Sequence, residues 1–411
     1  MKILVSAYAC EPGKGSEPGV GWNWVKMVSH RNEVWVLTRR NNRERIEEEL
    51  AKNPLPNVRF EYVDLPVWMA FWKRGQRGVR IYYYLWQYFA LRHARRLSRD
   101  YKFDVGHHVT FVNDWIWTFF SLLSIPYVWG PIGSNPRTPW SLLESRRSCL
   151  FDLSRFVFQC MARLVDPLFW LSVIRAKKII LINGQSLNLA PFTWLARRKT
   201  LIEPAIGVEE DLQPAPFSEK DRTIFLFAGR FIPIKCPQVA LDSFIKASKT
   251  NKNILLIMLG EGPLLSDLKA RSREYEVSDR VKFIPWLPRD EALSLMNESD
   301  IFLFPSAEGA GMVVLEALAL GKPVICLDLG GPGEFVNEAC GIKVPIGDHA
   351  RVIDRVSQAL LRLSSDKHLR ATLAQGARER SLHFVWRNKS ELINSIYNEI
   401  AVNKPDSGGV A

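Results

Sequence analysis

Short apolar runs alternate with helical patterns along most of the chain, and this alternation restricts the fold more than any other feature of the sequence. Six runs lie before residue 184, from KILVSAY to KKIILIN, and five follow, from TIFLFAG to KPVICLDL. Apolar strands separated by helices are typical of parallel sheets that are covered on both faces. Because 411 residues are too many for one ordinary core, we expect an α/β protein with two doubly wound, Rossmann-like domains.

A polar stretch that contains prolines, EPAIGVEEDLQPAPFSEKDR, marks the expected boundary between the domains. We expect an N-terminal domain over residues 1–203, a linker over 204–222 and a C-terminal domain over 223–380. A last helical pattern at 381–402 is predicted to pack back on the N-terminal domain. The tail at 403–411 is predicted to be disordered.

The net charge of +12 favours an anionic partner. The alternatives are the phosphates of a small ligand, a nucleic acid and an acidic membrane surface, and composition alone does not choose among them. The six cysteines are scattered, with no Cys-x-x-Cys pair and no histidine at metal-ligand spacing, so we expect a reducing cytoplasm and no structural zinc. The opening MKILVSAYAC is interpreted as a buried first strand and not as a signal peptide. No apolar run reaches the roughly 20 residues that span a bilayer.

The stretch EGAGMVVLE places Glu308 in a glycine-rich loop after a predicted strand and Glu316 about one turn into the helix that follows. Such a turn exposes unpaired backbone amides and the positive end of the helix dipole, where a phosphate binds. Carboxylates repel phosphate but accept paired hydrogen bonds from sugar and ribose hydroxyls. The alternative is a helix with an ordinary surface glutamate.

A second segment, GRFIPIK, follows the strand TIFLFA and carries Arg230 and Lys235. Both side chains lie at the carboxyl end of a predicted parallel strand, which is where ligands bind in such folds. A guanidinium fork and an ammonium together suit a diphosphate. The alternative is that both are solvated loop residues.

These segments occur in the order that characterises a known family, together with GEGPLL, VKFIPWLP and ALGKPVI. The chain resembles the retaining glycosyltransferases of family 4, the glycosyl transferases group 1, whose hallmark is a Glu-x7-Glu motif preceded by a Gly-Arg and a Lys. The resemblance implies the GT-B architecture, with two Rossmann-like domains that face a central cleft. It also implies transfer of a hexose-type sugar from a nucleotide diphosphate sugar to a saccharide or lipid-linked saccharide, in cell-surface polysaccharide biosynthesis.

The resemblance assigns roles to the residues of the second domain. Those implied to bind the donor diphosphate are Arg230, Lys235 and the amides of Gly311, Met312 and Val313. Glu308 is implied to hold the hydroxyls of the donor sugar, as a catalytic residue, and Glu316 to bind the ribose. Ala310 departs from the family, which usually has an aromatic residue there. Because the chain has no Asp-x-Asp pair, we expect no metal and no cofactor beyond the nucleotide sugar.

In the first domain, CEPGKGSEPGVGW does not match the dinucleotide fingerprint G-x-G-x-x-G. It resembles the N-terminal loop of a subgroup of the same family. The loop residues so identified are Gly15, Ser16, Glu17 and Gly19, and the first three are implied to lie between donor and acceptor.

Two adjacent histidines, His107 and His108, end a predicted strand in FDVGHHVTF. Family members often carry a histidine here that contacts the donor sugar, and the sequence does not distinguish which of the two corresponds to it. The alternative for both is a role in packing or hydrogen bonding.

Residues 67–97 interleave Trp, Tyr and Phe with Arg and Lys. Such a stretch suits an anionic lipid surface or a lipid-linked acceptor, and predicts peripheral contact with the inner face of the plasma membrane. The alternative is a buried helix with a solvated basic face.

Two other functions fit parts of the sequence. One is a sugar-nucleotide epimerase on the same fold, and the other is a basic nucleic-acid-binding protein, for which the net charge is the motive. Neither explains two glutamates at this spacing after Arg230 and Lys235, so no nucleic-acid partner is expected.

Overall fold

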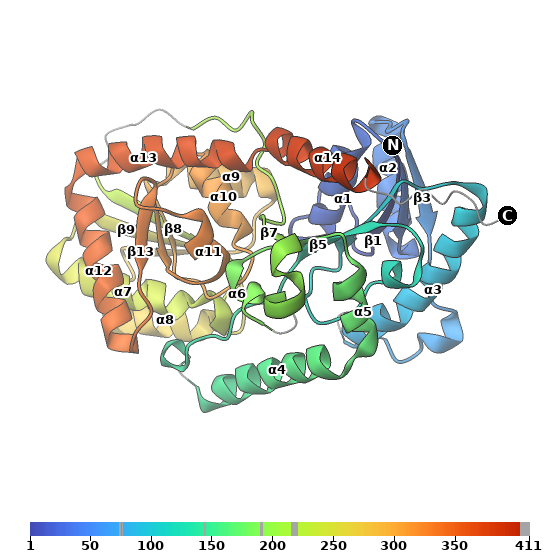
Figure 1. Cartoon of the computed structure of the whole chain (residues 1–411). Coiled ribbons are helices and arrows are strands. Elements are labelled where there is room, and N and C mark those ends of the chain that lie inside the picture. The colour runs from blue at the N-terminus through green and yellow to red at the C-terminus, as the bar shows by residue number, and fades with distance from the viewer. Residues whose placement is uncertain (74, 76, 144, 190–191, 215–220, 403–411) are drawn as a thin grey trace. The chain divides into compact units, whose positions relative to one another are not determined.

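The chain forms two compact units in a computed structural model (Figure 1). The described residues are 1–402 except 74, 76, 144, 190–191 and 215–220. Unit 1 comprises residues 1–134, 158–206 and the segment from Trp386 onwards, and unit 2 comprises residues 135–157 and 207–385.

Unit 1 is built on a sheet of seven parallel strands in the order β3-β2-β1-β4-β5-β6-β7. The strands are β1 (Lys2–Ala7), β2 (Glu33–Thr38), β3 (Val58–Tyr62), β4 (Val105–Thr110), β5 (Tyr127–Ile132), β6 (Lys178–Leu181) and β7 (Thr200–Ile202). The chain winds outward from β1 in one direction and from β4 in the other. The strand order therefore reverses between β1 and β4, as in a doubly wound fold.

Helices cover both faces of this sheet. The helices of unit 1 are α1 (Ser16–Ser29), α2 (Arg43–Lys52), α3 (Val79–Asp100), α5 (Pro167–Arg175), α6 (Gly184–Leu187) and α14 (Trp386–Val402). Trp24 of α1 and Tyr397 of α14 pack on the ring of His107, whereas Tyr83 of α3 packs on His108. Because successive residues of a strand point to opposite faces, α1 and α14 cover one face of β4 and α3 covers the other.

Helix α14 is an integral part of unit 1, although it comes last in the described chain (Figure 1). It packs against α1 and β4. Lys389 donates to the carbonyl of Pro204 at 2.9 Å, and Asn32 donates to the side chain of Asn394 at 2.9 Å. The predicted segment 381–402 begins five residues before α14, and the predicted tail at 403–411 lies outside the described residues.

Unit 2 repeats the same design with six parallel strands in the order β10-β9-β8-β11-β12-β13. The strands are β8 (Thr223–Ala228), β9 (Ile254–Leu259), β10 (Val281–Ile284), β11 (Ile301–Phe304), β12 (Val324–Leu327) and β13 (Gly341–Val344). Here the order reverses between β8 and β11. Both sheets are thus doubly wound, as the alternation of apolar runs predicts.

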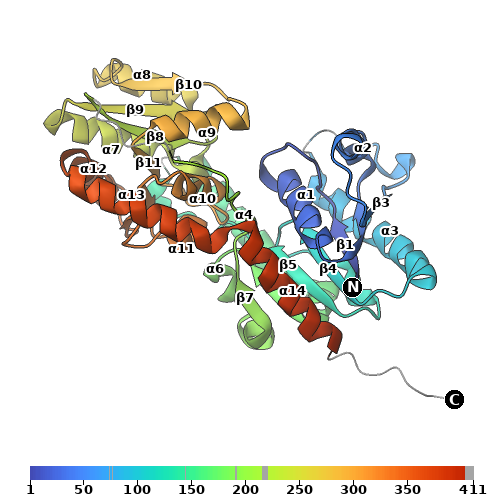
Figure 2. The same cartoon turned by 90° about the horizontal axis from the view of Figure 1, so that it is seen from above.

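The helices of unit 2 pack against its sheet and against each other. They are α7 (Pro237–Thr250), α8 (Leu265–Glu274), α9 (Arg289–Glu298), α10 (Met312–Ala319), α11 (Gly330–Phe335), α12 (His349–Ser365) and α13 (Lys367–Ser381). Helices α7 and α12 lie side by side (Figure 2). Helix α10 packs against β11, β12 and α13, which fixes the helix that carries Glu316.

One segment lies in a different unit from the one expected. Residues 135–157 fall inside the predicted N-terminal domain 1–203 but belong to unit 2. Asn135 accepts a hydrogen bond from the amide of Gly309 at 2.9 Å, and Ser141 donates to the carbonyl of Gly347 at 2.7 Å. The chain leaves unit 1 after β5 and returns to it later. The change at 206/207 lies within the predicted linker 204–222, of which residues 215–220 lie outside the described residues.

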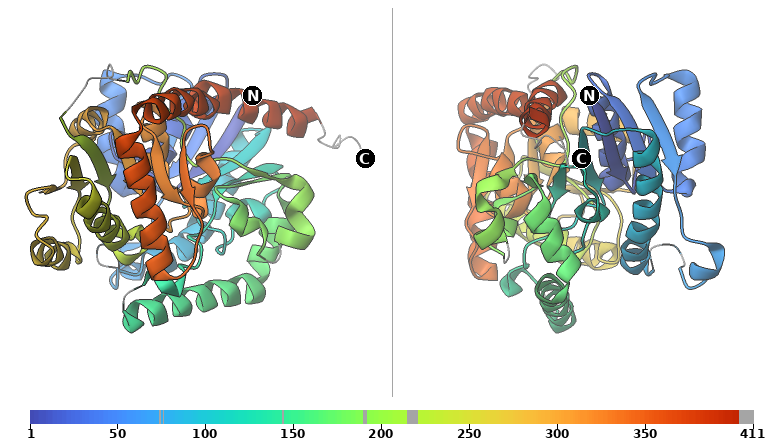
Figure 3. Two further views of the ribbon diagram at one scale, coloured as in Figure 1. Left: turned by 90° about the vertical axis from the view of Figure 1, so that its left-hand side faces the viewer. Right: turned by 45° about the vertical axis from the view of Figure 1, so that its right-hand side comes forward.

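The return to unit 1 is made by α4 (Arg146–Val165), a helix of 20 residues. It is joined to α5 at a bend of 71°. Figure 3 shows α4 as a long straight helix, with no other described helix or strand on its outer side.

Candidate functional site

The two segments of unit 2 that carry the sequence motifs end at the same edge of the sheet. Strands β8 and β11 are neighbours and pair in parallel, at the point where the strand order reverses. The chain leaves β8 through Gly229 and Arg230, and it leaves β11 through the loop 305–311. In open α/β sheets, ligands bind outside the carboxyl ends of the strands at this point.

Lys235 and Glu308 form an ion pair at this edge. Lys235 ends a short 3-10 turn, Pro233–Lys235, and its side chain is 16% exposed, while that of Glu308 is 14% exposed. The ammonium also lies 5.0 Å from the centre of the Phe304 ring. The structure therefore brings together two of the residues predicted from sequence, and the charge of Lys235 is balanced by Glu308.

The loop that carries Glu308 is held by backbone contacts. The amide of Ala307 donates to the carbonyl of Ile234 at 2.9 Å, and the amide of Gly331 donates to the carbonyl of Glu308 at 3.2 Å. A Cβ atom at Gly330 would lie 2.0 Å from that same carbonyl oxygen, so only glycine permits this approach. These contacts fix the backbone from which the Glu308 side chain extends.

Helix α10 begins directly after this loop. Its first residue is preceded by Gly311, which has a φ of 60° and packs so closely on Pro332 that a Cβ would lie 2.7 Å from its ring. The amides of the first turn, those of Met312 and Val313 among them, have no partner within the helix. Together with the helix dipole, unpaired amides of this kind can bind an anion, and binding of a phosphate at this helix start stays a prediction.

Glu316, in the second turn of α10, is paired with Arg289. The guanidinium donates to Oε1 of Glu316 twice, at 3.1 and 2.9 Å. Arg289 is the first residue of α9 and is half exposed. The sequence analysis missed Arg289, because a single arginine after LP carries no motif. Both bonds end on Oε1, so Oε2 keeps its capacity to accept from a hydroxyl.

Arg230 is exposed, and within the described part of the chain no carboxylate forms an ion pair with it. The loops after β8 and β9 lie in contact beside it. The amide of Phe231 donates to the carbonyl of Glu261 at 2.8 Å, and a Cβ at Gly262 would lie 2.4 Å from the carbonyl oxygen of Phe231. Arg230 thus extends from a well-packed loop and retains a free charge.

The glycine-rich loop of unit 1 lies at the corresponding place in its own sheet. Gly15 precedes α1, Ser16 has a φ of 62°, and a Cβ at Gly19 would lie 2.0 Å from a backbone carbonyl. The carboxylate of Glu17 accepts a hydrogen bond from the amide of Val112, just after β4. Burial raises the pKa of Glu17 to about 7, and the bond from Val112 opposes that rise. The loop therefore joins the ends of β1 and β4.

The structure shows His107 and His108 in the packing and hydrogen-bonding role that was the alternative, and a contact of either with the donor sugar stays a prediction. Both side chains are fully buried within unit 1. The hydrogen-bonding partners are Gly130 and Tyr397 for His107, and Thr118 and Tyr83 for His108. Burial lowers the pKa of His107 to about 4 and that of His108 to about 3. Because helices cover both faces of β4, residues of either orientation enter the core.

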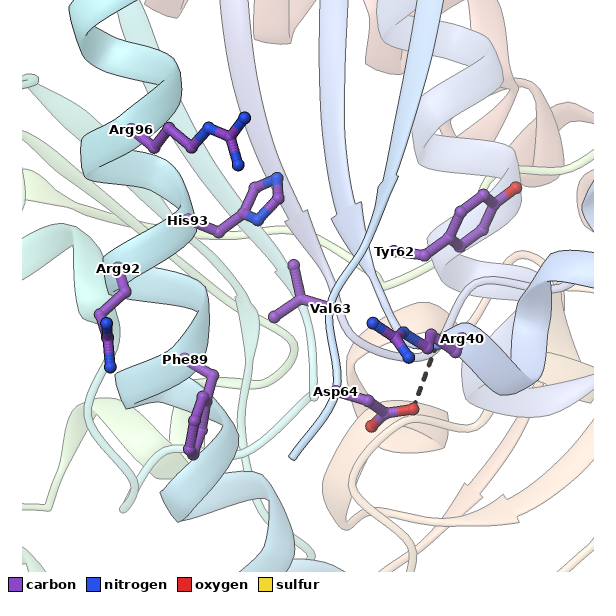
Figure 4. A pocket seen from close by; sticks show the side chains of 8 residues that line it. All are labelled: Arg40, Tyr62, Val63, Asp64, Phe89, Arg92, His93 and Arg96. Atoms are coloured by element: carbon purple, nitrogen blue, oxygen red, sulfur yellow. Dashed lines mark hydrogen bonds between the residues drawn. The ribbon is translucent and has the colours of Figure 1, made fainter. Parts of the chain in front are cut away.

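A cavity of about 370 Å³ lies in unit 1 between the end of β3 and α3 (Figure 4). Its lining residues are Arg40, Tyr62, Val63, Asp64, Phe89, Arg92, His93 and Arg96. Asp64 accepts from the amide of Arg40 at 3.3 Å, and His93 contacts the carboxylate of Glu61 at 2.9 Å. Arg92 and Arg96 lie one turn apart on α3. Their spacing could have indicated a basic pocket, but the sequence alone was not interpreted in this way.

Among the described residues, no three or more His, Cys, Asp or Glu side chains come together as a metal-binding group. At the carboxyl edge of the unit 2 sheet, the groups available for chemistry are positively charged side chains, the amides at the start of α10 and two carboxylates.

Residues 208–380 match the family model described as Glycosyl transferases group 1. The matched range is less than half of the chain, and it shows that unit 2 is similar to this family. The group 1 family model covers unit 2 from near its boundary with unit 1 almost to the end of α13, so it contains every unit 2 residue of the candidate site.

Relatives within the family match over part of their length. Over 190 residues the chain is 30% identical to a D-inositol 3-phosphate glycosyltransferase of Saccharomonospora viridis, which covers 44% of this chain and 43% of that protein. Over 213 residues it is 25% identical to an uncharacterised glycosyltransferase of Bacillus subtilis, which covers 50% of this chain and 58% of that protein. The chain thus spans about half the length of the curated relatives it matches.

Solved structures of similar fold match along nearly the whole chain. A sucrose-phosphate synthase from Thermosynechococcus elongatus has a TM-score of 0.67 at 18% identity, with 98% of this chain and 99% of that chain covered. HepE of Anabaena in complex with UDP has a TM-score of 0.65 at 16% identity, with 97% and 100% covered. The lipopolysaccharide outer core galactosyltransferase WaaB has a TM-score of 0.63 at 16% identity, with 96% and 100% covered. The fold is therefore that of the GT-B glycosyltransferases.

Proposed function

We propose that this chain is a member of the group 1 family that transfers a hexose-type sugar from a nucleotide diphosphate sugar to a hydroxyl group, with retention of anomeric configuration. The observation that carries the proposal is the Lys235–Glu308 ion pair beside the first turn of α10, at the switch point of unit 2. This arrangement supports the proposal, because a cation, helix amides and a carboxylate are the groups that suit a sugar diphosphate.

Donor binding follows from the charges at this edge. Arg230 and Lys235 hold the diphosphate, and the amides of the α10 N-terminus, from Gly311 to Val313, hold its distal phosphate. Glu316 accepts from the ribose hydroxyls through its carboxylate. When the diphosphate takes over Lys235, Glu308 is released to accept hydrogen bonds from the sugar.

Catalysis follows from the same groups. The bond between the anomeric carbon and the phosphate oxygen breaks, and its electron pair passes to the leaving diphosphate, where Arg230, Lys235 and the helix amides stabilise the charge. The acceptor oxygen forms its bond to the anomeric carbon from the same face, and its proton passes to a phosphate oxygen. No carboxylate nucleophile is needed, and positive side chains take the place of a metal ion.

The acceptor is proposed only as a chemical class. We assign a saccharide or a lipid-linked saccharide of cell-surface polysaccharide synthesis, with the glycine-rich loop of unit 1, at Gly15 to Glu17, close to it. Support comes from WaaB, a lipopolysaccharide outer core galactosyltransferase of the same fold. The basic pocket of unit 1 adds a place for an anionic group.

The first experiment measures thermal unfolding with UDP, GDP, ADP and CMP and with their sugar conjugates, all in the presence of a chelator. One nucleoside diphosphate is expected to raise the melting temperature, and Arg230→Ala to abolish that rise. A stabilisation that needs magnesium would contradict the metal-independent site.

The second experiment incubates the stabilising sugar nucleotide with saccharide acceptors and follows release of the nucleoside diphosphate. The product is expected to carry the anomeric configuration of the donor, as seen by NMR. Conversion of the sugar nucleotide to an isomer without acceptor would identify an epimerase instead.

A further inference from the structure

Helix α4 differs from an ordinary surface helix, because three of its polar side chains are buried and seven of its exposed side chains are large and apolar. Asp152, Gln159 and Arg163 are buried, at spacings of seven and four residues that place them on one side of the helix. In an ordinary amphipathic helix this side would be apolar. The inversion indicates that α4 meets something other than water on its outer side.

The inward side chains are bound by specific partners. Arg163 donates to the carboxylate of Asp114 at 2.5 Å and to its carbonyl at 3.1 Å, and both side chains are almost completely buried. Arg155 donates to Asp152 at 2.7 Å and to the carbonyl of Asn135 at 3.2 Å. These contacts fix the rotation of α4 about its axis.

The outer face of α4 is mainly apolar, with one polar residue, Ser154, between Phe151 and Phe158. The exposed large apolar residues of α4 are Leu150, Phe151, Val157, Phe158, Met161, Leu164 and Val165. Phe151, Phe158 and Val165 follow at intervals of seven, and all are more than half exposed. We call these seven residues the α4 stripe. A contiguous exposed patch of this kind marks an interaction surface.

An exposed aromatic face of α3 continues the stripe within unit 1. Phe158 packs edge-on against Trp115, with ring centres 5.5 Å apart, and Arg80 lies over the same indole at 5.5 Å. Beside Arg80, Ile81 and Tyr88 are exposed on α3. The opposite side of α3 is apolar and enters the core, which agrees with the alternative interpretation of residues 67–97 as a buried helix with a solvated basic face.

The charges around this surface are positive. Arg146 and Arg147 are exposed at the start of α4, whose single acidic residue, Asp152, is buried. The exposed side of α3 passes from Tyr88 to a run of arginines, which are Arg92, Arg95, Arg96 and Arg99. An apolar stripe flanked by arginines complements a layer of anionic headgroups over acyl chains.

From these observations we propose that α4 lies in the plane of an anionic lipid bilayer surface, with the α4 stripe in the headgroup and acyl boundary and the arginines on the lipid phosphates. This assigns a membrane contact to a helix for which the donor and acceptor chemistry has no use, and it is independent of the proposed function. No single described helix is long and apolar enough to cross a bilayer, whereas α4 and α5 together have the length and composition but are bent by 71°. The ion pair of Arg163 with Asp114 holds α4 on the protein, as the in-plane arrangement requires.

The experiment is flotation of the full chain with vesicles of phosphatidylcholine alone and of phosphatidylcholine with phosphatidylglycerol. The test variant is Leu150→Gln/Phe151→Gln/Leu164→Gln, which keeps helix-forming residues and touches none of the inward contacts. The matched controls, Tyr275→Gln and Val402→Gln, remove exposed apolar side chains of α8's end and of α14. Thermal unfolding verifies that each variant is folded. If the triple variant is not folded, the single variant Leu164→Gln replaces it.

The wild type and both controls are expected to float with the anionic vesicles, and the test variant to lose this binding about tenfold. Equal flotation of the test variant and the wild type would overturn the proposal, as would equal binding to neutral vesicles. Absence of flotation in the wild type would also overturn it. In that case, self-association of the wild type that the test variant lacks would identify a second copy of the chain as the occupant. None of these readouts depends on sugar transfer.

Discussion

Lys235 and Glu308 are 73 positions apart in the chain and form an ion pair across the ends of two neighbouring strands. The lysine proposed to bind a diphosphate and the glutamate proposed to bind sugar hydroxyls thus neutralise each other in this structure. Both side chains are largely shielded from water, so neither is a freely solvated charge. Under the proposed function, donor binding is therefore an exchange of partners rather than the filling of an empty site.

The exchange predicts unequal effects for the two glutamates. Glu308→Ala is expected to lower kcat about 100-fold, equivalent to roughly 2.7 kcal/mol of transition-state stabilisation, because the sugar loses its carboxylate while Lys235 stays free for the phosphates. The KM for the donor should change little. Steady-state kinetics with the donor found by thermal shift test this, and a mild change in both constants would refute the assignment of Glu308.

Glu316→Ala is expected to act mainly on donor affinity. Loss of the ribose contact should raise the KM for the donor about tenfold with kcat nearly unchanged. Arg289→Ala is the matched control, because it removes the partner of Glu316 and keeps the carboxylate. If Arg289→Ala weakens donor binding as much as Glu316→Ala, the carboxylate is not the ribose ligand.

The Asp114–Arg163 pair is expected to be a large contributor to stability. Asp114→Ala leaves Arg163 charged and buried without its carboxylate, and such a loss costs about 3–5 kcal/mol. Urea denaturation measures it. Glu47→Ala, which removes an exposed pair with Arg43 on α2, should cost far less than Asp114→Ala, because solvent screens both charges. Similar costs for the two variants would contradict the burial of the first pair.

Acid is expected to destabilise the protein through the two core histidines. Burial lowers the pKa values of His107 and His108 to about 4 and about 3, from 6.5. The unfolded chain therefore binds protons that the folded chain does not, so stability is complete above pH 6.5 and falls as the pH is lowered toward 4. Each histidine contributes at most about 1.4 kcal/mol per pH unit. The unfolding midpoint between pH 4.5 and 7.5 tests this, and His108→Gln should reduce the slope.

Glu17 is expected to have the opposite pH dependence. Burial raises its pKa to about 7 from 4.5, so the folded state prefers the protonated form. Stability from this group is present below pH 4.5 and is lost as the pH rises through 7, by roughly 3 kcal/mol at most. Glu17→Gln should remove this loss, so the variant should be more stable than wild type at pH 8 and similar at pH 4.5. A variant that is less stable than wild type at pH 8 would show that folding does not raise the pKa of Glu17.

The sequence predicted the parts of this molecule that depend on local pattern. Buried parallel strands are recognisable in the sequence as apolar runs. Arg230, Lys235 and Glu308 each come after such a run, so the sequence places them at the carboxyl edge of the sheet. Arg289 could not be found, because its pairing with Glu316 depends on where two helices start. The histidines were placed at a strand end correctly, but the covering of His107 depends on α14, which comes from the far end of the chain. The placement of residues 135–157 likewise depends on contacts with Gly309 and Gly347, which are distant in sequence.

The chain changes unit after residues 134, 157, 206 and 385, and this has a consequence for protein synthesis. As the chain leaves the ribosome, β1 to β7 are complete by residue 202, yet the face of β4 that carries His107 is covered only by α1 until Tyr397 of α14 has been made. Unit 2 is fully synthesised at residue 385, before α14. Unit 1 begins first and is therefore completed after unit 2, and its core stays partly open to chaperones and proteases while unit 2 is made.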